Sequence, residues 1–204
     1  MTLPRILLLG DSIRIGYEQI VTALLDGQAE IVAPSENCTD TRNTLAKLDS
    51  WLDFYRPSAV HWNNGLHDIK HVTGEPKCQV EPPDYAANLR AIADKLVSAM
   101  PGRVLWATTT PVIEVLHNPV KGFDRFNADI DTYNRAARTI MLERKIPITD
   151  LHALISADPP RYILASDGVH LTDAGRCATA LAVTLTLRSS LSLHNLHPTY
   201  RMPA

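Results

Sequence analysis

Arg5-Ile6-Leu7-Leu8-Leu9 is followed directly by Gly10-Asp11-Ser12-Ile13, and this stretch decides the fold. The apolar run is nearly continuous, as expected for a strand that is buried on both faces of a sheet. The glycine and the polar residues after it end the strand and lead into an amphipathic helix, which we expect at about 13–25. A buried strand followed at once by a helix is typical of a parallel sheet with helices on its faces.

The same alternation continues along the chain. Further strands are expected at 30–32, 59–62, 104–108 and 147–149, and further helices at 41–55, 83–100, 129–145 and 173–187. The segments 70–83 and 109–126 contain several prolines and glycines, so we expect loops there. The pattern predicts one domain over 1–204 with a three-layer α/β/α, flavodoxin-like fold, a five-stranded parallel sheet and the strand order 2-1-3-4-5. Its core is expected at about 4–187, and a tail without periodicity at 193–204.

The composition is that of an ordinary globular protein and disfavours several classes of partner. The 204 residues include 20 Lys and Arg against 22 Asp and Glu, for a formal charge of −2, and 45% are hydrophobic. This balance offers no basic surface for nucleic acid and no polybasic segment for an anionic membrane. The apolar run before Gly10 is too short for a secretory signal, and no stretch approaches a membrane span. We therefore expect a cytoplasmic protein that acts on a small molecule or a neutral polymer.

The cysteines have neither the density of a disulfide framework nor the spacing of a metal site. They stand at Cys38, Cys78 and Cys177. Free thiols are the expectation, with a Cys38–Cys78 bridge between two loops as the alternative.

Ser12 stands where the first strand ends and the first helix begins. A serine there has its hydroxyl at the carboxyl edge of the sheet, where ligand sites form in this fold class. The backbone N–H groups at the start of the helix can bind an anion or a developing oxyanion. The alternative is that Ser12 is only the N-cap of the helix, a common role for serine.

Near the other end of the chain, 167–172 reads Asp-Gly-Val-His-Leu-Thr. A serine nucleophile needs a base to take its proton, and the base needs an acceptor on its other nitrogen. Asp167 stands three residues before His170 in a loop that Gly168 can bend, so the carboxylate can turn back onto the imidazole. The alternative is an Asp–His pair that only caps the final helix.

Together, Gly10-Asp11-Ser12 and Asp167-x-x-His170 resemble the first and last sequence blocks of the SGNH hydrolase superfamily, which includes the GDSL-type esterases and lipases. The blocks stand at opposite ends of the chain in the family order, and the resemblance covers about 4–187. It implies a serine ester hydrolase with Ser12 as nucleophile, His170 as base and Asp167 behind the base, without a cofactor or a metal ion. The G-x-S-x-G elbow is absent, which argues against the α/β-hydrolase family.

The middle blocks of the resemblance differ from the family pattern. The second block has no glycine, and the N–H of Thr39 can take the place of the glycine N–H in the oxyanion hole. The third block is normally G-x-N-D, and here His67 aligns with its asparagine. A neutral imidazole N–H donates a hydrogen bond much as an amide does. The resemblance thus implies an oxyanion hole of Ser12, Thr39 and His67, with Asn63 or Asn64 as the alternative to His67; the other interpretation is that His67 only caps the strand end.

Two further patterns have structural explanations. His67 and His71 have the i, i+4 spacing of a zinc pair, but glycines flank them and a third ligand is missing, so we expect no metal there. Trp51, Phe54 and Tyr55 lie at helical spacing and are expected to pack in the core. Three other side chains are compatible both with a pocket lining and with ordinary burial: Trp62, His117 and Tyr162.

The resemblance leaves the substrate open, because the family acts on short acyl esters, acetylated sugars, lysophospholipids and thioesters. No long apolar lid is evident, so we expect a small acyl group such as acetyl on a carbohydrate or another polar alcohol. One alternative is an O-acyltransferase with the same triad, and another is an inactive ligand-binding module, which has no need of Ser12, Asp167 and His170 together. A nucleotide-binding function is disfavoured, because the sequence contains neither G-x-G-x-x-G nor G-K-[ST]. The sequence does not specify the oligomeric state.

Overall fold

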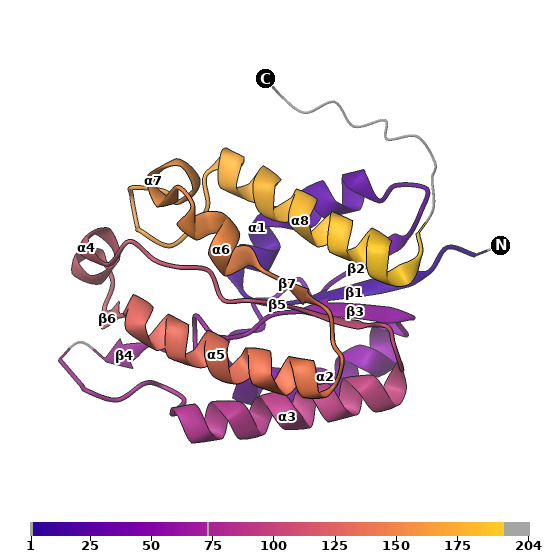
Figure 1. Cartoon of the computed structure of the whole chain (residues 1–204), viewed down its shortest axis with the longest axis horizontal. Coiled ribbons are helices and arrows are strands. Elements are labelled where there is room, and N and C mark those ends of the chain that lie inside the picture. Colours follow the sequence, from indigo (N-terminus) through magenta and orange to yellow (C-terminus); the bar gives the residue numbers. More distant parts are fainter. Residues whose placement is uncertain (1, 73, 194–204) are drawn as a thin grey trace.

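A five-stranded parallel sheet forms the centre of the molecule. The computed structural model describes residues 2–72 and 74–193. The strands are β1 (Arg5–Leu9), β2 (Glu30–Val32), β3 (Ala59–Trp62), β5 (Val104–Ala107) and β7 (Ile148–Thr149), in the order β2-β1-β3-β5-β7 (Figure 1). Counted over the strands of this sheet, the order is the predicted 2-1-3-4-5, and the predicted fold class is confirmed.

The two central strands place the carboxyl end of the sheet. Ile6 to Leu9 in β1 are completely buried, as the continuous apolar run predicts. In the register of β1 and β3, Leu9 lies opposite Trp62. The residues that follow, Gly10 on one strand and Asn63 on the other, therefore meet at the same edge of the sheet.

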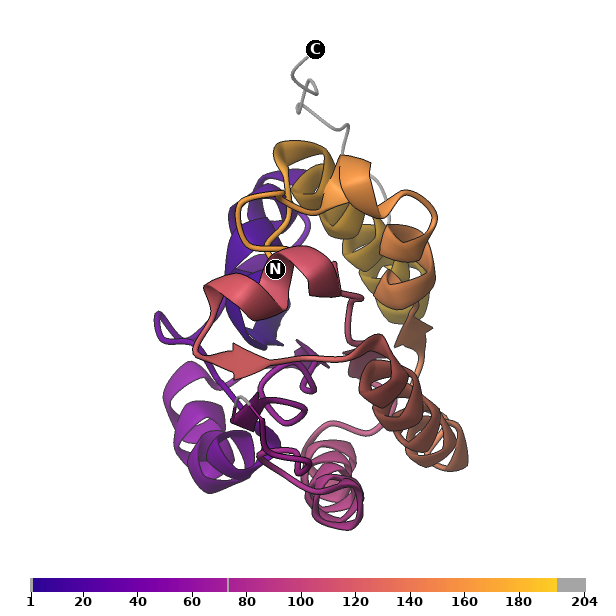
Figure 2. The same cartoon turned by 90° about the vertical axis from the view of Figure 1, so that its left-hand side faces the viewer.

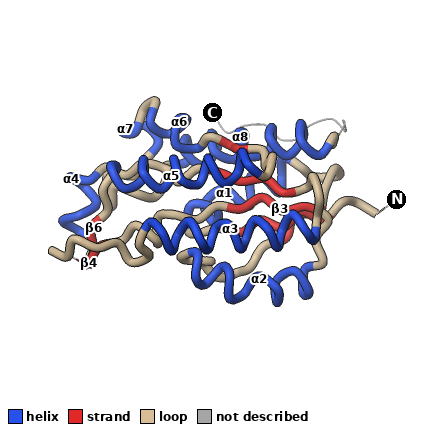
Figure 3. Tube along the Cα trace, turned by 60° about the horizontal axis from the view of Figure 1, so that its bottom comes forward, coloured by secondary structure: helices blue, strands red, loops and turns tan. Residues whose placement is uncertain are grey.

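Helices cover both faces of the sheet, which confirms the three-layer arrangement. α1 (Ser12–Leu24) and α8 (Asp173–Leu191) pack along each other on one face, with α6 (Leu151–Ser156) beside α8. The other face is covered by α2 (Thr41–Tyr55), α3 (Pro82–Ala99) and α5 (Asn127–Glu143) (Figure 3). The helix expected at 173–187 continues one turn further, to Leu191.

The structure contains short elements in segments where the sequence predicts loops. β4 (His71–Val72) and β6 (Phe123–Asp124) pair antiparallel in a second sheet, and α4 (Glu114–His117) and the 3-10 helix η1 (Asn118–Val120) come just before β6. α6 and α7 (Pro159–Tyr162) also lack a counterpart in the sequence prediction. Figure 2 shows the segment with α4 and β6 crossing the end of the molecule where the strands finish. The predictions of plain loops at 70–83 and 109–126 are therefore wrong, because the first segment contains β4 and the second contains α4, η1 and β6.

Several smaller expectations are corrected or confirmed. Trp51 is buried, but Phe54 is 78% exposed, so the expectation of a core position for Phe54 is wrong. The cysteines are free, as expected, and the alternative Cys38–Cys78 bridge is not formed. The predicted tail at 193–204 lies outside the described residues from 194 onward. Within the described residues, no helix has both the length and the apolar character needed to cross a membrane.

Candidate active site

Ser12 is the first residue of α1 and lies at the carboxyl end of β1. The N-cap of this helix is Asp11, whose side chain accepts the N–H of Ile13 at 2.9 Å. The alternative interpretation of Ser12 as the N-cap is therefore wrong, and its hydroxyl is free for another partner. A residue larger than glycine does not fit at position 10, between β1 and α1, because its Cβ would lie 2.0 Å from Oδ1 of Asn63.

The hydroxyl of Ser12 lies beside the ring of His170, in the loop before α8. Ser12 Oγ is 3.0 Å from His170 Nε2, and His170 Nδ1 is hydrogen-bonded to Oδ2 of Asp167. A carboxylate accepts hydrogen bonds but does not donate them, so Nδ1 carries the proton and Nε2 presents its lone pair to the hydroxyl. The structure thus brings Ser12, His170 and Asp167 together in the order that a serine nucleophile, its base and an orienting carboxylate require.

Asp167 also holds its own loop in shape. Its Oδ1 accepts the backbone N–H groups of Val169 and His170, each at 3.0 Å. Gly168, which stands between Asp167 and Val169, has a φ of 65°, in the left-handed region that favours glycine. Burial raises the pKa of Asp167, but the hydrogen bonds from His170 and Val169 outweigh burial and hold the pKa at about 2. The carboxylate is therefore ionised at neutral pH and fixes the orientation of the imidazole.

Behind this loop lies a buried Arg–His pair. Arg125 Nε donates to the carbonyl oxygen of Leu66 at 2.5 Å, and its Nη1 lies 3.2 Å from Nε2 of His117. A guanidinium only donates, so His117 Nε2 accepts, and His117 Nδ1–H donates to the carbonyl oxygen of Asp167 at 3.0 Å. The pair thus links the loop of Asp167 to the loop after β3. Sequence reasoning found no role for Arg125 and left His117 undecided between pocket and core.

The candidate oxyanion donors differ in how free they are. The Ser12 N–H makes no hydrogen bond among the described residues and lies at the positive end of α1. Thr39 has a φ of 53°, and its N–H donates to Oδ1 of Asn37 at 2.8 Å. Thr39 is therefore not free to donate to a ligand unless Asn37 releases it.

His67 lines the pocket beside Ser12, whereas Asn63 and Asn64, the alternative donors, do not. Burial lowers the pKa of His67 to about 4, with a further contribution from Lys70 and Arg125, so its ring is neutral at pH 7. Asn63 is buried with its Oδ1 against Gly10. Asn64 donates to the carbonyl oxygen of Thr39 at 3.2 Å and so stabilises the turn at Thr39.

The pocket beside Ser12 and His170 has a volume of about 210 Å³ and a cationic wall. Lys70, Lys121 and Arg125 line it together with His67, and no carboxylate does. The ring of Phe123 is in contact with two of these cations, with Lys70 Nζ 4.6 Å and Arg125 Cζ 4.9 Å from its centre. Arg125 Nη2 makes no hydrogen bond among the described residues, so it is available to a ligand.

A second pocket of about 170 Å³ lies on the other side of the Ser12–His170 pair. Ile13, Gly16, Leu164 and Leu171 line it, and Arg176 closes one side. Its walls are largely apolar. The serine hydroxyl therefore stands between one small apolar pocket and one cationic pocket.

The pair His67 and His71 does not form a metal site. His67 faces the active-site pocket, while the ring nitrogens of His71 contact the carbonyl oxygen of Glu75, Asp129 and Cys78. Within the described part of the chain, His71, Cys78 and Asp129 are the group whose donor atoms converge, and His67 does not belong to it.

The comparisons with known proteins identify both fold and family. The model of the GDSL-like lipase/acylhydrolase family matches residues 8–176. Among solved structures, an acetyl xylan esterase is 20% identical with a TM-score of 0.71, over 88% of this chain and 97% of that one. The lipase/acylhydrolase from Enterococcus faecalis is 17% identical with a TM-score of 0.72, over 96% of this chain and 100% of that one. Axe2, an acetylxylan esterase from Geobacillus stearothermophilus, is 17% identical with a TM-score of 0.69, over 94% of this chain and 95% of that one.

No curated protein sequence matches the chain at a significant level. At the identities given above, the likeness to solved structures shows the fold, whereas the family model covers most of the chain. The chain therefore belongs to the GDSL-like lipase/acylhydrolase family, a family of carboxylic ester hydrolases, as the motifs at its two ends predict.

Proposed function

We propose that the protein hydrolyses small acyl esters of a polar alcohol through an acyl-enzyme on Ser12. The observation that carries this proposal is the distance of 3.0 Å between Ser12 Oγ and His170 Nε2, with Asp167 bonded to the opposite ring nitrogen. A nucleophile and its base within hydrogen-bond reach, with the base oriented by a third group, are the parts that acyl transfer requires.

In the first half of the reaction, Ser12 Oγ forms a bond to the ester carbonyl carbon while its proton passes to His170 Nε2. The carbonyl oxygen becomes an oxyanion, and Asp167 stabilises the imidazolium. The bond from carbon to the alcohol oxygen then breaks, and His170 returns the proton to the leaving alcohol. In the second half, water repeats these steps, releases the carboxylic acid and restores the Ser12 hydroxyl. No step needs a cofactor.

The oxyanion accepts hydrogen bonds from the backbone N–H of Ser12 and from the ring N–H of neutral His67. The depressed pKa of His67 supports this role, because the ring keeps one N–H to donate and carries no charge of its own at pH 7. Thr39 contributes its N–H only when substrate displaces the Oδ1 of Asn37. Each such donor is worth about 10²–10³ in turnover.

The two pockets divide the substrate. The apolar pocket beside Gly16 has a volume of about 170 Å³ and takes the acyl group, which restricts it to acetyl and slightly longer chains. The cationic pocket takes the alcohol. Three cations and no carboxylate line that pocket, so the alcohol carries an anionic group such as a carboxylate or a phosphate.

Two alternatives use the same fold. An O-acyltransferase differs only in the acceptor of the second half-reaction; the His170 side chain is 39% exposed, so water reaches the base and hydrolysis is favoured. An inactive binding module does not require the contact between Ser12 and His170, and that contact favours the enzyme.

The first experiment compares p-nitrophenyl acetate hydrolysis by the wild type and by Ser12→Ala. Ser189→Ala, which removes a serine hydroxyl from the far end of α8, is the matched control. We expect a loss of about 10³-fold or more for Ser12→Ala alone, and labelling of Ser12 by a fluorophosphonate. Equal rates in all three proteins, without labelling, would contradict the proposal. Acetate formed with and without an added sugar acceptor separates hydrolase from transferase.

The second experiment tests the anionic alcohol with 3-acetoxybenzoate and its methyl ester. The ratio of their kcat/KM values measures the preference for the anion. We expect Lys70→Gln to lower this ratio by about tenfold and Lys95→Gln to leave it unchanged, because Lys95 pairs with Asp49 between α3 and α2. Hydrolysis of both esters with a ratio that Lys70→Gln does not alter would retain the esterase and reject the anionic substrate.

A further inference from the structure

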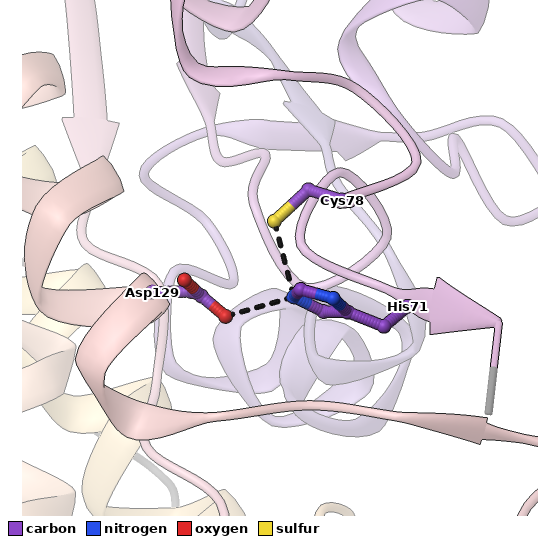
Figure 4. A group of neighbouring side chains, drawn as sticks. All are labelled: His71, Cys78 and Asp129. Carbon is purple, nitrogen blue, oxygen red and sulfur yellow. Dashed lines mark hydrogen bonds and ion pairs between the residues drawn. The ribbon is translucent and has the colours of Figure 1, made fainter. Parts of the chain in front are cut away.

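Outside the active site, three possible metal ligands lie together (Figure 4). His71 belongs to β4, Cys78 forms an isolated β-bridge with it, and Asp129 lies in the first turn of α5. One donor atom from each of the three lies within 4.8 Å of the other two. The group therefore joins two segments of the chain that are more than 50 residues apart.

Both partners approach the same atom of the His71 ring. Asp129 Oδ2 lies 2.9 Å from Nε2, and Cys78 Sγ lies 3.3 Å from Nε2 (Figure 4). In a catalytic triad the nucleophile and the carboxylate contact opposite ring nitrogens. This arrangement is therefore not a second nucleophile with its base, but a set of donors that converge on one point.

The other ring nitrogen shows where the proton of His71 lies. Nδ1 is 3.1 Å from the carbonyl oxygen of Glu75, which can only accept, so Nδ1 carries a hydrogen. In the neutral ring, Nε2 then has a lone pair. The Cys78 thiol can donate to this lone pair, but the Asp129 carboxylate cannot, so the close approach of Asp129 requires a proton or a metal ion at Nε2. A histidine that binds a metal through one nitrogen typically donates its other N–H to a carbonyl or carboxylate in this way.

The distances fit a small cation with tetrahedral geometry. Bonds of about 2.05 Å to nitrogen and oxygen and about 2.3 Å to sulfur separate the N and O ligands by about 3.3 Å and the N and S ligands by about 3.6 Å. The corresponding separations here are 2.9 and 3.3 Å. These two pairs of donors need to move apart by less than about 0.5 Å to admit the ion, and the remaining pair, the Cys78 sulfur and the Asp129 oxygen, lies within 4.8 Å.

The surroundings also favour a cation and leave it one open position. The carboxylates of Asp129 and Glu81 lie near enough to Cys78 to act on it electrostatically, and they make the local charge negative. Cys78 and Asp129 are partly exposed, so water can reach the centre of the group as a fourth ligand.

We propose that His71 Nε2, Cys78 Sγ and a carboxylate oxygen of Asp129 bind one Zn²⁺ ion, with water as the fourth ligand. Nitrogen, sulfur and oxygen donors together suit Zn²⁺ better than Mg²⁺ or Ca²⁺, which prefer oxygen. Binding releases the thiol proton of Cys78 to solvent, because the thiolate is the ligand. The ion ties the segment that carries His67 and Lys70 to α5, and so fixes one wall of the active-site pocket.

The test titrates the full-length protein, first treated with a chelator, with Zn²⁺ alone in an isothermal calorimeter. We expect one ion per chain, with proton release that shows as a dependence of the heat on the buffer. His71→Gln and Cys78→Ser should each weaken binding by more than about a hundredfold. Two matched controls should bind as the wild type does: Cys177→Ser, and His152→Gln, which alters a more exposed His–Asp pair with a spacing of 3.6 Å.

Cobalt binding to the wild type gives a second readout that needs no variant. A thiolate-to-cobalt charge-transfer band that Cys78→Ser removes would support the site. Absence of binding, or Zn²⁺ affinity unchanged in both His71→Gln and Cys78→Ser, would overturn the proposal and leave His71 and Asp129 as an ion pair. None of these readouts depends on esterase activity, so the two proposals can fail independently.

Discussion

Asp68 accepts two hydrogen bonds from Thr41, one from its backbone N–H at 2.9 Å and one from its hydroxyl at 2.6 Å. Thr41 is the first residue of α2, and Asp68 follows His67 directly. The contact therefore attaches the loop that carries His67 to the start of α2, which follows the turn at Thr39. Both hydrogen bonds end on Oδ1, and Oδ2 is buried without a partner among the described residues.

The first prediction concerns the pH dependence of stability. Burial raises the pKa of Asp68 to about 7, although the bonds from Thr41 oppose the rise. Between the unfolded pKa, near 3.8, and about 7, the folded chain keeps a proton that the unfolded chain has lost, so this group lowers stability as pH rises across that window. Asp68→Asn removes the effect. Its stability relative to the wild type should increase from about pH 4 to about pH 7 in urea unfolding. The exposed control Asp53→Asn should show no such trend; the same trend in both variants would contradict the assignment.

The second prediction concerns His67 as an oxyanion donor. His67→Ala should lower kcat by about 10²–10³, whereas His67→Asn should retain much of the activity because an amide also donates. Since the pKa of His67 is about 4, its ring stays neutral above about pH 5. The acidic limb of kcat/KM above that pH should therefore be the same in the wild type and in His67→Asn. A limb that moves with this substitution would mean that His67 titrates during catalysis.

The third prediction separates the charge of Asp167 from its role in the loop. In Asp167→Asn, Oδ1 can still accept the N–H groups of Val169 and His170, but the amide Nδ2 donates to His170 Nδ1 and favours the wrong tautomer. We expect kcat to fall by about 10⁴ with thermal stability largely retained. Asp173→Asn, whose side chain is 96% exposed at the start of α8, is the control for removing a nearby carboxylate. Activity close to that of the wild type would show that Asp167 does not orient the base.

The fourth prediction concerns the turn that holds His170. A Cβ at Gly168 would lie 2.6 Å from the carbonyl oxygen of Ile113, at a φ of 65°. Gly168→Ala should therefore destabilise the protein by about 1–3 kcal/mol and also lower kcat, because the loop must shift. Gly122→Ala is the matched control, since a Cβ there meets nothing within 4 Å. Unfolding by urea measures the first effect, and a Gly168→Ala variant as stable and active as Gly122→Ala would refute the prediction.

The parts of the fold that sequence predicts are those with a strong periodic signal. The completely apolar run 6–9 identifies β1, and the stripe of apolar residues in 41–55 identifies α2. β4 and β6 contain only two residues each, too few for an alternating pattern, and they form because their partners are brought together by the rest of the fold. Phe54 lies about 130° round the helix from the middle of the apolar stripe of α2, which consists of Leu45, Leu48, Trp51 and Leu52, and this angle explains its exposure.

In the candidate site, the residues that sequence reasoning found are those in short motifs. Ser12 and the segment 167–170 carry recognisable spacing, so their approach is predictable although 158 residues separate Ser12 from His170. Arg125 lies just before α5 and Asp129 lies in its first turn, and no recognisable motif surrounds either residue. Their roles depend on contacts with His117 and His71, which only the folded chain creates. A buried arginine is also contrary to the usual exposure of that residue type, so composition gives no warning of it.

The packing of α1 along α8 has a consequence for biosynthesis. Ser12 begins one of these helices and His170 stands just before the other, so the proposed nucleophile leaves the ribosome 158 residues before its proposed base. While these residues are being made, the nascent chain carries the serine hydroxyl without the imidazole that is proposed to activate it. On this proposal, turnover begins only when α8 docks against α1. A fluorogenic ester would therefore report the completion of folding in real time.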